Sequence, residues 1–240
     1  MAELEPIANT CTKFQEKMVA LHLQPSQPPL TGPKNLTRCK DDYHKKLVAH
    51  GIERRYWNCT FDQLRTYPTE LSNAIQRCKN YADKFETYKR RGIGLLMKGP
   101  VGTMKTTLAV AILQETIQHY GGGYFISMAS LLDKMLTMGK KGSPEDLLNF
   151  ESRIRNTPLL LLDDLGTEYQ NNWVITKVDA IISERYNRML PIIITTNLNA
   201  DGLMGQYQER IYDRLKSTSL VLNFNGVSQR QGPKWEDDKE

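Results

Sequence analysis

The stretch Gly92–Gln114, GIGLLMKGPVGTMKTTLAVAILQ, decides how the rest of the chain is interpreted. It opens with a short apolar run, passes through a turn that contains glycine, and continues as a long apolar segment with helical spacing. A strand that turns sharply into a helix directs several backbone N–H groups at one point, and such a concavity binds phosphate. The stretch therefore predicts a strand, a phosphate-binding loop and a helix, in that order.

The loop has the spacing of a phosphate-binding motif with one departure. Lys105 is placed to reach the β and γ phosphates of a nucleotide, and the Thr106 hydroxyl is placed to join a magnesium shell. Met104 stands where the last glycine before the lysine is expected. We expect Gly102 to supply the tight bend, so that Met104 enters the helix with negative φ and points its side chain away from the phosphates. A positive φ at Met104 would cost about 1–3 kcal/mol. An ordinary strand-to-helix turn that binds no nucleotide is the alternative for this motif alone. The predicted nucleotide-binding residues are Gly99, Pro100, Val101, Gly102, Thr103, Met104, Lys105, Thr106 and Thr107.

Polar side chains lie at the carboxyl ends of two further apolar strands. Asp163 and Asp164 follow four consecutive leucines, and Asn197 ends the apolar run that begins at Pro191. Ligands of parallel sheets bind at the carboxyl ends of the strands, so these groups are expected near the loop. Asp163 suits magnesium binding, Asp164 is suited to orient and deprotonate an attacking water, and the Asn197 amide is suited to hold that water. Aspartate and asparagine also favour ordinary turns, which is the alternative for each strand end alone.

Strand and helix signals alternate from residue 69 to residue 224. Uninterrupted apolar runs between amphipathic helices are typical of a parallel sheet with helices on both faces, so the sequence predicts an α/β fold. Gly92 is expected to end the first helix, and Ser130 to cap a later one. Ser143 and Pro144 are expected to open the helix after that. The expected strands are 92–99, 124–128, 158–164, 191–197 and 219–224. The expected helices are 69–91, 106–120, 130–138, 145–155, 173–189 and 208–217.

The amino-terminal part differs in composition from the rest. Residues 24–34, QPSQPPLTGPK, are too rich in proline to continue a helix or join a sheet interior, and they predict a linker. Before it, residues 11–23 carry one apolar helical face that can dock on the chain's own core or on a partner. Residues 34–55 hold seven basic and three acidic residues next to Tyr56 and Trp57. This pattern fits either contact with nucleic acid or a solvated basic face.

Composition excludes several classes of protein. The 240 residues are 40% hydrophobic, 25% charged and 8% aromatic, which are ordinary values for a globular protein. No apolar run is long enough to span a membrane, and the opening MAELEPIANT lacks the pattern of a signal peptide, so a cytoplasmic location without membrane contact is expected. The four cysteines form no metal-binding pair pattern and are expected to be reduced. The net charge of +5 suits an anionic partner without identifying one.

Four motifs carry a resemblance to a known family. In order and spacing, GPVGTMKTT, LLLLDDLGTE, IIITTN and QERIYDRL resemble the motifs of the DnaC/DnaI-type helicase loaders, within the DnaC/IstB branch of AAA+ ATPases. The resemblance covers roughly residues 51 to 232. It implies an AAA+ P-loop NTPase fold with a minimal lid, because the chain after Arg210 is too short for a full helical lid domain. It also implies a small partner-binding region at residues 1–50 and an ATPase domain at residues 51–240.

The resemblance assigns roles to single residues by their place in these motifs. Lys105 and Thr106 fall in the Walker A loop, and Asp163 and Asp164 fall in Walker B. This implies a site for ATP and for Mg²⁺, with Thr106 and Asp163 as the metal ligands. Asn197 falls at the position named sensor 1.

Two arginines complete the site that the resemblance implies. Arg210 falls at the arginine finger, which in this family acts on the site of the neighbouring subunit, so a homo-oligomeric ring or spiral is implied. Arg214, one turn later, can face the same interface. Arg230 matches sensor 2 by its distance from Arg210. A surface salt bridge with Glu209 or Asp213 is the alternative for Arg210 and Arg214.

The implied function is ATP-dependent loading of a hexameric replicative helicase onto single-stranded DNA. One alternative is a transposition helper of the IstB type, an ATPase that binds duplex DNA and activates a transposase. A second alternative is a structural adaptor that does not hydrolyse ATP because Met104 impairs its loop. The sequence DDLGTE looks more like the loaders than the transposition helpers.

Overall fold

The structure, a computed structural model, describes residues 42–64, 69–168 and 171–230. The described residues from His44 onward make up one compact unit by their internal contacts. The predicted linker at 24–34 and the predicted helical face at 11–23 lie outside the described residues. Both therefore remain predictions.

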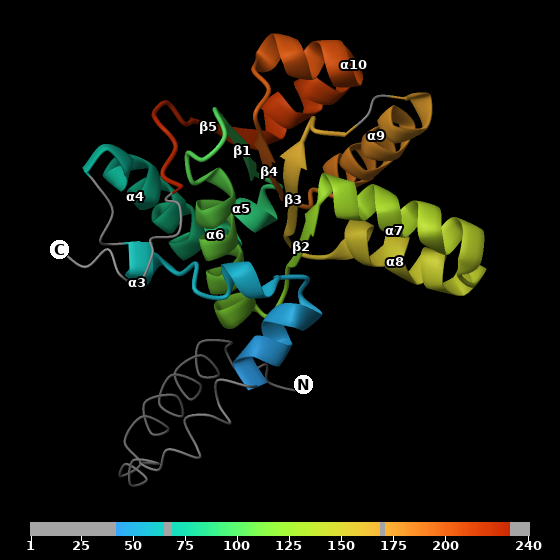
Figure 1. Ribbon diagram of the computed structural model, residues 1–240, viewed down its shortest axis with the longest axis horizontal. Coiled ribbons are helices and arrows are strands. Elements are labelled where there is room, and N and C mark those ends of the chain that lie inside the picture. The colour runs from blue at the N-terminus through green and yellow to red at the C-terminus, as the bar shows by residue number, and fades with distance from the viewer. Residues whose placement is uncertain (1–41, 65–68, 169–170, 231–240) are drawn as a thin grey trace, which may run out of the picture. The chain divides into compact units, whose positions relative to one another are not determined.

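Five parallel strands form one sheet in the order β2-β3-β4-β1-β5 (Figure 1). The strands are β1 Gly94–Lys98, β2 Tyr124–Ser127, β3 Leu160–Leu165, β4 Ile192–Thr196 and β5 Ser219–Asn223. Strand β1 lies between β4 and β5, with Lys98 opposite both Thr196 and Asn223. Because all strands are parallel, the motifs that follow β1, β3 and β4 meet at one edge of the sheet. The predicted α/β fold is confirmed.

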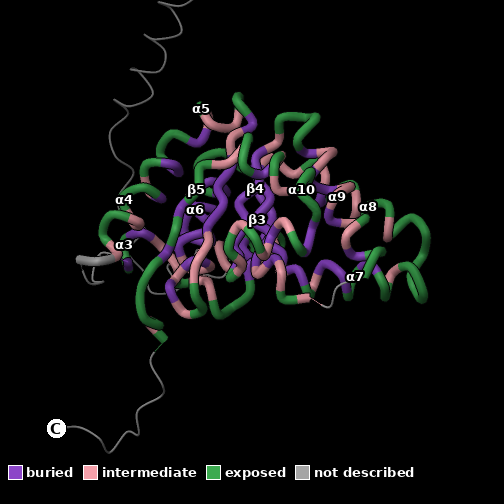
Figure 2. Tube along the Cα trace, turned by 90° about the horizontal axis from the view of Figure 1, so that it is seen from above, coloured by how far each residue is buried: buried purple, intermediate pink, exposed green. Residues whose placement is uncertain are grey.

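Helices cover both faces of this sheet (Figures 1 and 2). Helix α6 lies on one face together with α4, whereas α7, α8, α9 and α10 form a layer on the other face. Alternate strand residues supply the two buried layers: Leu96, Leu162 and Ile194 belong to the cluster shared with α7 to α10. The helical segments are residues 42–49, η1 Arg54–Tyr56, α3 Phe61–Leu64, α4 Thr69–Asp83, α5 Phe85–Arg90, α6 Lys105–Tyr120, α7 Met128–Lys141, α8 Pro144–Asn156, α9 Asn172–Asn187 and α10 Ala200–Thr218.

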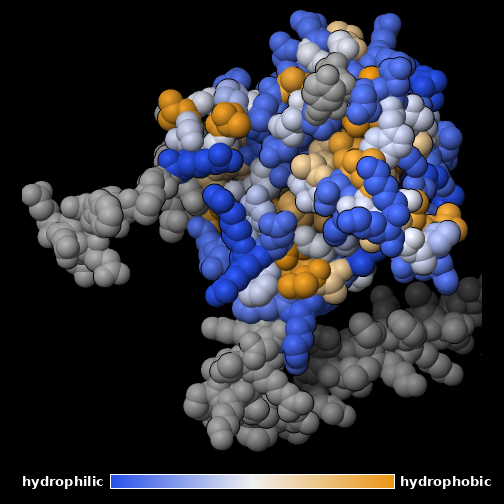
Figure 3. Space-filling model, turned by 45° about the vertical axis from the view of Figure 1, so that its right-hand side comes forward, coloured by the Kyte–Doolittle hydropathy of each residue, from blue (hydrophilic) through white to orange (hydrophobic). Residues whose placement is uncertain are grey.

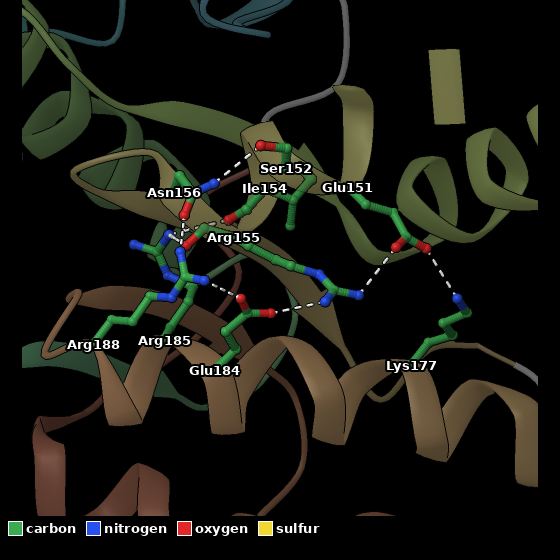
Figure 4. A network of polar contacts seen from close by, with 9 residues as sticks. All are labelled: Glu151, Ser152, Ile154, Arg155, Asn156, Lys177, Glu184, Arg185 and Arg188. Atoms are coloured by element: carbon green, nitrogen blue, oxygen red, sulfur yellow. Dashed lines mark hydrogen bonds and ion pairs between the residues drawn. The ribbon is translucent and has the colours of Figure 1, made fainter. Parts of the chain in front are cut away.

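A polar network joins the end of α8 to α9 (Figure 4). At its centre Arg185 is fully buried and donates hydrogen bonds to the carbonyl oxygens of Ile154 at 3.0 Å, Arg155 at 3.2 Å and Pro191 at 2.8 Å. Burial lowers the pKa of Arg185 to about 9. The surrounding ion pairs are Arg155–Glu151, Arg155–Glu184, Lys177–Glu151 and Arg188–Glu184. Arg185 thus satisfies carbonyl groups at the carboxyl end of α8 and in the turn before β4.

Three predicted helix boundaries are wrong. The helix expected at 208–217 begins at Ala200, as α10. The helix expected to run continuously to Gly92 is divided into α4 and α5 at Lys84, which has φ −103° and ψ 17°. Spacing could not reveal the break, because the aromatic positions Tyr81 and Phe85 keep helical spacing across it. Helix α7 is capped by Ser127 rather than Ser130: the Ser127 side chain accepts a hydrogen bond from the Ser130 amide at 3.2 Å.

The face seen in Figure 3 is mostly hydrophilic. On the face seen in Figure 3, exposed apolar residues form small groups separated by polar side chains. Among the described residues, the helices are all too short or too polar to cross a bilayer.

Candidate functional site

Two glycines of the loop between β1 and α6 are required by its backbone. Gly99 has a φ of 151° and Gly102 a φ of 79°, values that favour glycine. Space also excludes a side chain at either position. A Cβ on Gly99 would lie 2.1 Å from the carbonyl oxygen of Phe224, and a Cβ on Gly102 would lie 2.0 Å from the hydroxyl oxygen of Ser228.

Met104 also has a positive φ, so the predicted negative φ at this residue is wrong. It caps the amino end of α6 with φ 70° and ψ 14°. Both Gly102 and Met104 are left-handed, so the turn into α6 uses a second such residue and Gly102 alone does not complete it. The amide of Leu108 donates to the carbonyl oxygen of Met104 at 3.0 Å, so the helix begins directly after this residue. The left-handed conformation costs a residue with a Cβ about 1–2 kcal/mol.

Lys105 connects the loop to the end of β4. Its side chain is 5% exposed. The ammonium donates to the carbonyl oxygens of Gly99 and Pro100, both at 2.7 Å, and to Oδ1 of Asn197 at 2.9 Å. Burial lowers the pKa of Lys105, while the nearby Asp164 and Asp163 raise it. All three N–H donors of the ammonium have acceptors within the chain.

Asp163, at the end of β3, accepts two hydrogen bonds on one oxygen. The hydroxyl groups of Thr106 and Thr195 donate to Oδ1 at 2.8 Å and 2.6 Å. Burial raises the pKa of Asp163, and the two hydroxyl groups oppose that shift. Carboxylate and hydroxyl oxygens are ligands that Mg²⁺ accepts, so Thr106 and Asp163 form a donor pair that fits this ion. The described residues contain no cluster of three or more His, Cys, Asp or Glu side chains suited to a metal.

Asp164 has a left-handed backbone, with a φ of 57°. Its amide donates to the hydroxyl oxygen of Thr195 at 2.9 Å, and its carbonyl oxygen accepts from the Thr167 hydroxyl at 2.9 Å. The pairing between β3 and β4 shifts register between Leu162 and Leu165, which is where the two aspartates lie. This irregularity therefore determines the directions in which the side chains of Asp163 and Asp164 point.

These groups meet at a pocket of about 260 Å³ at the carboxyl edge of the sheet. The structure brings most of the predicted site residues to this pocket, while Gly99, Pro100 and Asp163 contact residues that line it. The lining residues are Arg55, Tyr56, Val101, Gly102, Thr103, Met104, Lys105, Thr106, Thr107, Asp164, Asn197, Gln229 and Arg230.

Sequence reasoning did not place Arg55 and Tyr56 in this pocket. They lie in η1, which is held against α6 because the Gln114 amide donates to the Tyr56 carbonyl oxygen at 2.8 Å. Burial raises the pKa of Tyr56, and Asp163 adds to the shift. The neighbouring Trp57 stacks on His44 with ring centroids 4.2 Å apart. No pattern in the sequence connects η1 to the loop.

The segment after β5 returns to the loop and supports it. The Phe224 amide donates to the Lys98 carbonyl oxygen at 2.7 Å, and the Gln229 amide donates to the Gly102 carbonyl oxygen at 2.8 Å. These bonds bring the next residue, Arg230, to the rim of the pocket. Arg230 is near enough to Lys105 to lower the pKa of that amine.

Arg210 and Arg214 do not line this pocket. They bind Asp179 of α9, at 2.5 Å from Arg210 and 3.0 Å from Arg214. Glu209 and Asp213, the partners in the alternative interpretation, are not the acceptors in these two ion pairs. The Arg210 side chain is 59% exposed. Helix α10 is interrupted just before it at Gln208, which has φ 71° and ψ 151°. An arginine so placed can act on a phosphate only outside its own pocket.

The fold and the site together define a P-loop ATPase of the AAA+ class. The strands are parallel, a lysine-bearing phosphate loop follows the inner strand β1, acidic groups lie in the last half of β3, and an amide group follows β4. Comparison with known proteins identifies the family within this class. The chain belongs to the IstB-like ATP binding protein family, which matches residues 85–236.

Individual relatives and a solved structure agree with this family. The chain is 27% identical over 183 residues to the replicative helicase loader DnaC of Escherichia coli (strain K12), which covers 75% of this chain and 72% of that protein. It is 22% identical over 268 residues to the replicative helicase loader DnaI of Bacillus subtilis (strain 168), covering 90% and 85% of the two. The crystal structure of the DnaC helicase loader matches 72% of this chain and 100% of that chain, with 27% identity and a TM-score of 0.64.

Proposed function

We propose that this chain is an ATP-hydrolysing loader that places a hexameric replicative helicase on single-stranded DNA. The observation that carries the proposal is one pocket that gathers the loop lysine, Asp164, Asn197 and Arg230, in a chain similar to DnaC over 72% of that loader. A non-hydrolysing adaptor would need neither the acidic nor the amide group beside the phosphate loop. The relatives DnaC and DnaI favour a loader over a transposition helper.

In the proposed reaction, ATP binding changes the partners of Lys105. Backbone N–H groups of the loop and of the amino end of α6 receive the phosphates. Lys105 takes a phosphate oxygen in place of one of its present acceptors, and Asn197 is the acceptor that a side-chain rotation can release. Asn197 then holds the attacking water, which Asp164 orients and deprotonates. One hydrogen bond of 2.9 Å thus couples phosphate binding to the placement of water.

Three further groups complete the proposed chemistry. Thr106 and Asp163 would hold Mg²⁺, which neutralises phosphate charge when it is bound. Arg230 contributes positive charge at the rim of the same pocket. Arg210, exposed and outside the pocket, is proposed to reach the γ phosphate in a neighbouring copy of the chain, which requires a ring or spiral oligomer.

The proposal also assigns different functions to two parts of the chain. Residues 1–50 bind the helicase, and residues 51–240 form the ATPase. The protein works in the cytoplasm, where replication proteins meet DNA. Residues 44–50 pack with the ATPase unit, where Leu47 is fully buried, so the test removes residues 1–43. This truncation is expected to abolish co-purification with a hexameric helicase and to leave ATP binding in place.

Phosphate release tests the proposed reaction. Purified protein is given ATP and Mg²⁺, with and without single-stranded DNA, beside the variant Lys105→Ala. We expect turnover by the native chain, stimulation by single-stranded DNA, and a loss of roughly 100-fold or more in Lys105→Ala, because the variant lacks the cation that meets the phosphates.

The control arms separate the alternatives. Equally slow phosphate release by the native chain and Lys105→Ala would contradict hydrolysis. Stimulation by duplex DNA alone would favour a transposition helper instead of a loader.

A further inference from the structure

We propose that Thr195 is a positioning residue that sets the geometry of both aspartates of the ATP site; the inference rests on the proposed function. Thr195 lies on β4, two residues before Asn197, and is fully buried. Its hydroxyl group donates to Oδ1 of Asp163 at 2.6 Å and accepts from the amide of Asp164 at 2.9 Å. One oxygen atom therefore contacts the side chain of one aspartate and the backbone of the other.

The first contact fixes how the Asp163 carboxylate is turned. Thr106 and Thr195 donate to the same oxygen. Thr106 comes from α6, which packs on the sheet, and Thr195 comes from β4, the strand next to β3. Two donors from separate elements hold one carboxylate oxygen and leave little freedom of rotation about the Cβ–Cγ bond. Without Thr195, only the Thr106 hydroxyl would hold Oδ1.

The second contact replaces a missing backbone partner. Pairing between β3 and β4 is regular up to Leu162 and resumes at Leu165 after a register shift. The amide of Asp164 falls inside this irregular stretch and donates to the Thr195 side chain. An unpaired amide there would be costly, and the left-handed φ of 57° at Asp164 would lose its support. The hydroxyl group thus stabilises the turn that presents the Asp164 side chain to the pocket.

The chain offers a matched control in the next residue. Thr196 is also fully buried, and its hydroxyl group also donates once and accepts once. It donates to the Leu165 carbonyl oxygen at 2.6 Å and accepts from the Leu198 amide at 3.0 Å. It contacts neither aspartate. Thr195→Val and Thr196→Val therefore remove the same number of hydrogen bonds at the same depth with the same change of shape.

Steady-state ATP hydrolysis compares the two variants. We expect Thr195→Val to lower kcat by roughly 100-fold with KM for ATP changed by less than about threefold, because the loop that binds ATP is intact. We expect Thr196→Val to keep kcat within about threefold of the native value. Urea unfolding should show similar losses of midpoint in both. Equal loss of turnover in the two variants, or native turnover in Thr195→Val, overturns the proposal.

A pair of smaller variants keeps the test valid if Thr195→Val does not fold. Thr195→Ser keeps the hydroxyl group and Thr195→Ala removes it, at nearly equal volume. The proposal expects native-like turnover from the serine variant and a loss only from the alanine variant. Equal turnover in this pair contradicts it.

A readout without hydrolysis separates this proposal from the proposed function. Crystal structures of Thr195→Ala and Thr195→Ser are expected to differ at Asp164, which leaves the left-handed region only in the alanine variant. An unchanged Asp164 backbone in both overturns the inference. Failure of the proposed function shows differently, as a native chain that hydrolyses ATP no faster than Lys105→Ala.

Discussion

At the scale of single residues, four described residues other than glycine have positive φ: Met104, Asp164, Met189 and Gln208. Met104 and Asp164 line the pocket, and Gln208 lies two residues before Arg210. Such conformations persist only where the surrounding structure imposes them, and they concentrate at functional positions. At Met104 the folded loop already has the left-handed geometry. The energetic cost of the methionine therefore falls on folding and not on nucleotide binding.

Substitutions at Met104 test where this cost falls. Met104→Gly is expected to keep the Kd for ATP within about threefold, because glycine adopts the same φ without strain. Met104→Val is expected to lower the free energy of unfolding by about 1–2 kcal/mol relative to Met104→Gly, because a β-branched residue tolerates a positive φ poorly. Urea unfolding and titration with a fluorescent ATP analogue measure the two effects.

A large gain of affinity would contradict this assignment. If Met104→Gly tightened ATP binding by about tenfold or more, the strain would be relieved on binding, which means that the methionine opposes the bound geometry. A Met104→Asn variant is the control, because asparagine also tolerates left-handed backbone while keeping a side chain.

Residue-level prediction succeeded where polar side chains end apolar strands. Lys105, Asp164 and Asn197 meet at one pocket because parallel strands bring their carboxyl ends together. It failed at Met104, since spacing says which conformation is inexpensive and not that the turn into α6 has a second left-handed residue after Gly102. It also missed Tyr56, which reaches the pocket only through tertiary contacts with α6.

At the scale of elements, helix α9 connects two neighbours. Its inner side places Arg185 on the last carbonyl groups of α8 and on Pro191, just before β4. Its outer side places Asp179 against Arg210 and Arg214 of α10. The buried contact fixes the helix, and the exposed contact orients side chains. We expect the two to differ strongly in their effect on stability.

Arg185→Met tests the buried contact. The substitution leaves three backbone carbonyl oxygens without their donor, so the free energy of unfolding is expected to fall by about 2–4 kcal/mol. Arg188→Met is the matched control. Arg188 caps the carboxyl end of α9, three residues after Arg185, and this half-exposed arginine pairs with Glu184. There the loss should stay below about 1 kcal/mol. Chemical denaturation measures both, and equal losses would contradict a special role for Arg185.

The sequence predicted which segments form helices and strands more reliably than where those helices and strands begin and end. Uninterrupted apolar strands and amphipathic helices differ in period, so the alternation was visible. The division at Lys84 was not, because helical spacing continues across it. The helix expected at 208–217 begins at Ala200, so its predicted start fell at the kink at Gln208 and the first part of α10 was missed.

At the scale of the whole molecule, the site and its proposed finger lie apart. Arg210 pairs with Asp179 outside the pocket, and its side chain is 59% exposed. Lys105 and Arg230 line the pocket, whereas Arg210 does not. In the proposed reaction another copy of the chain supplies this arginine, so the proposal makes hydrolysis depend on assembly.

Mixing two inactive variants tests this dependence. Lys105→Ala keeps Arg210 but loses its own site, whereas Arg210→Ala keeps its site but loses the finger. Each alone is expected to lose roughly 100-fold or more in ATP turnover. Mixed in equal amounts, they are expected to regain a substantial fraction of native activity, measured by phosphate release, because some sites then adjoin an intact arginine.

The double variant Lys105→Ala/Arg210→Ala is the control for this mixture. Added to Arg210→Ala, it should restore no activity. Native turnover by Arg210→Ala alone, or a mixture no more active than its two components, would contradict an arginine that acts in trans.

The segment after β5 has a consequence for how the protein is made. The loop at residues 99–104 is supported by backbone bonds from Phe224 and Gln229, and β1 is flanked by β5 as well as β4. A ribosome that has synthesised the loop must therefore add more than a hundred residues before its supports exist. The nascent chain cannot complete its nucleotide pocket until Gln229 and Arg230 have left the exit tunnel. Residues 1–50 are synthesised well before that point.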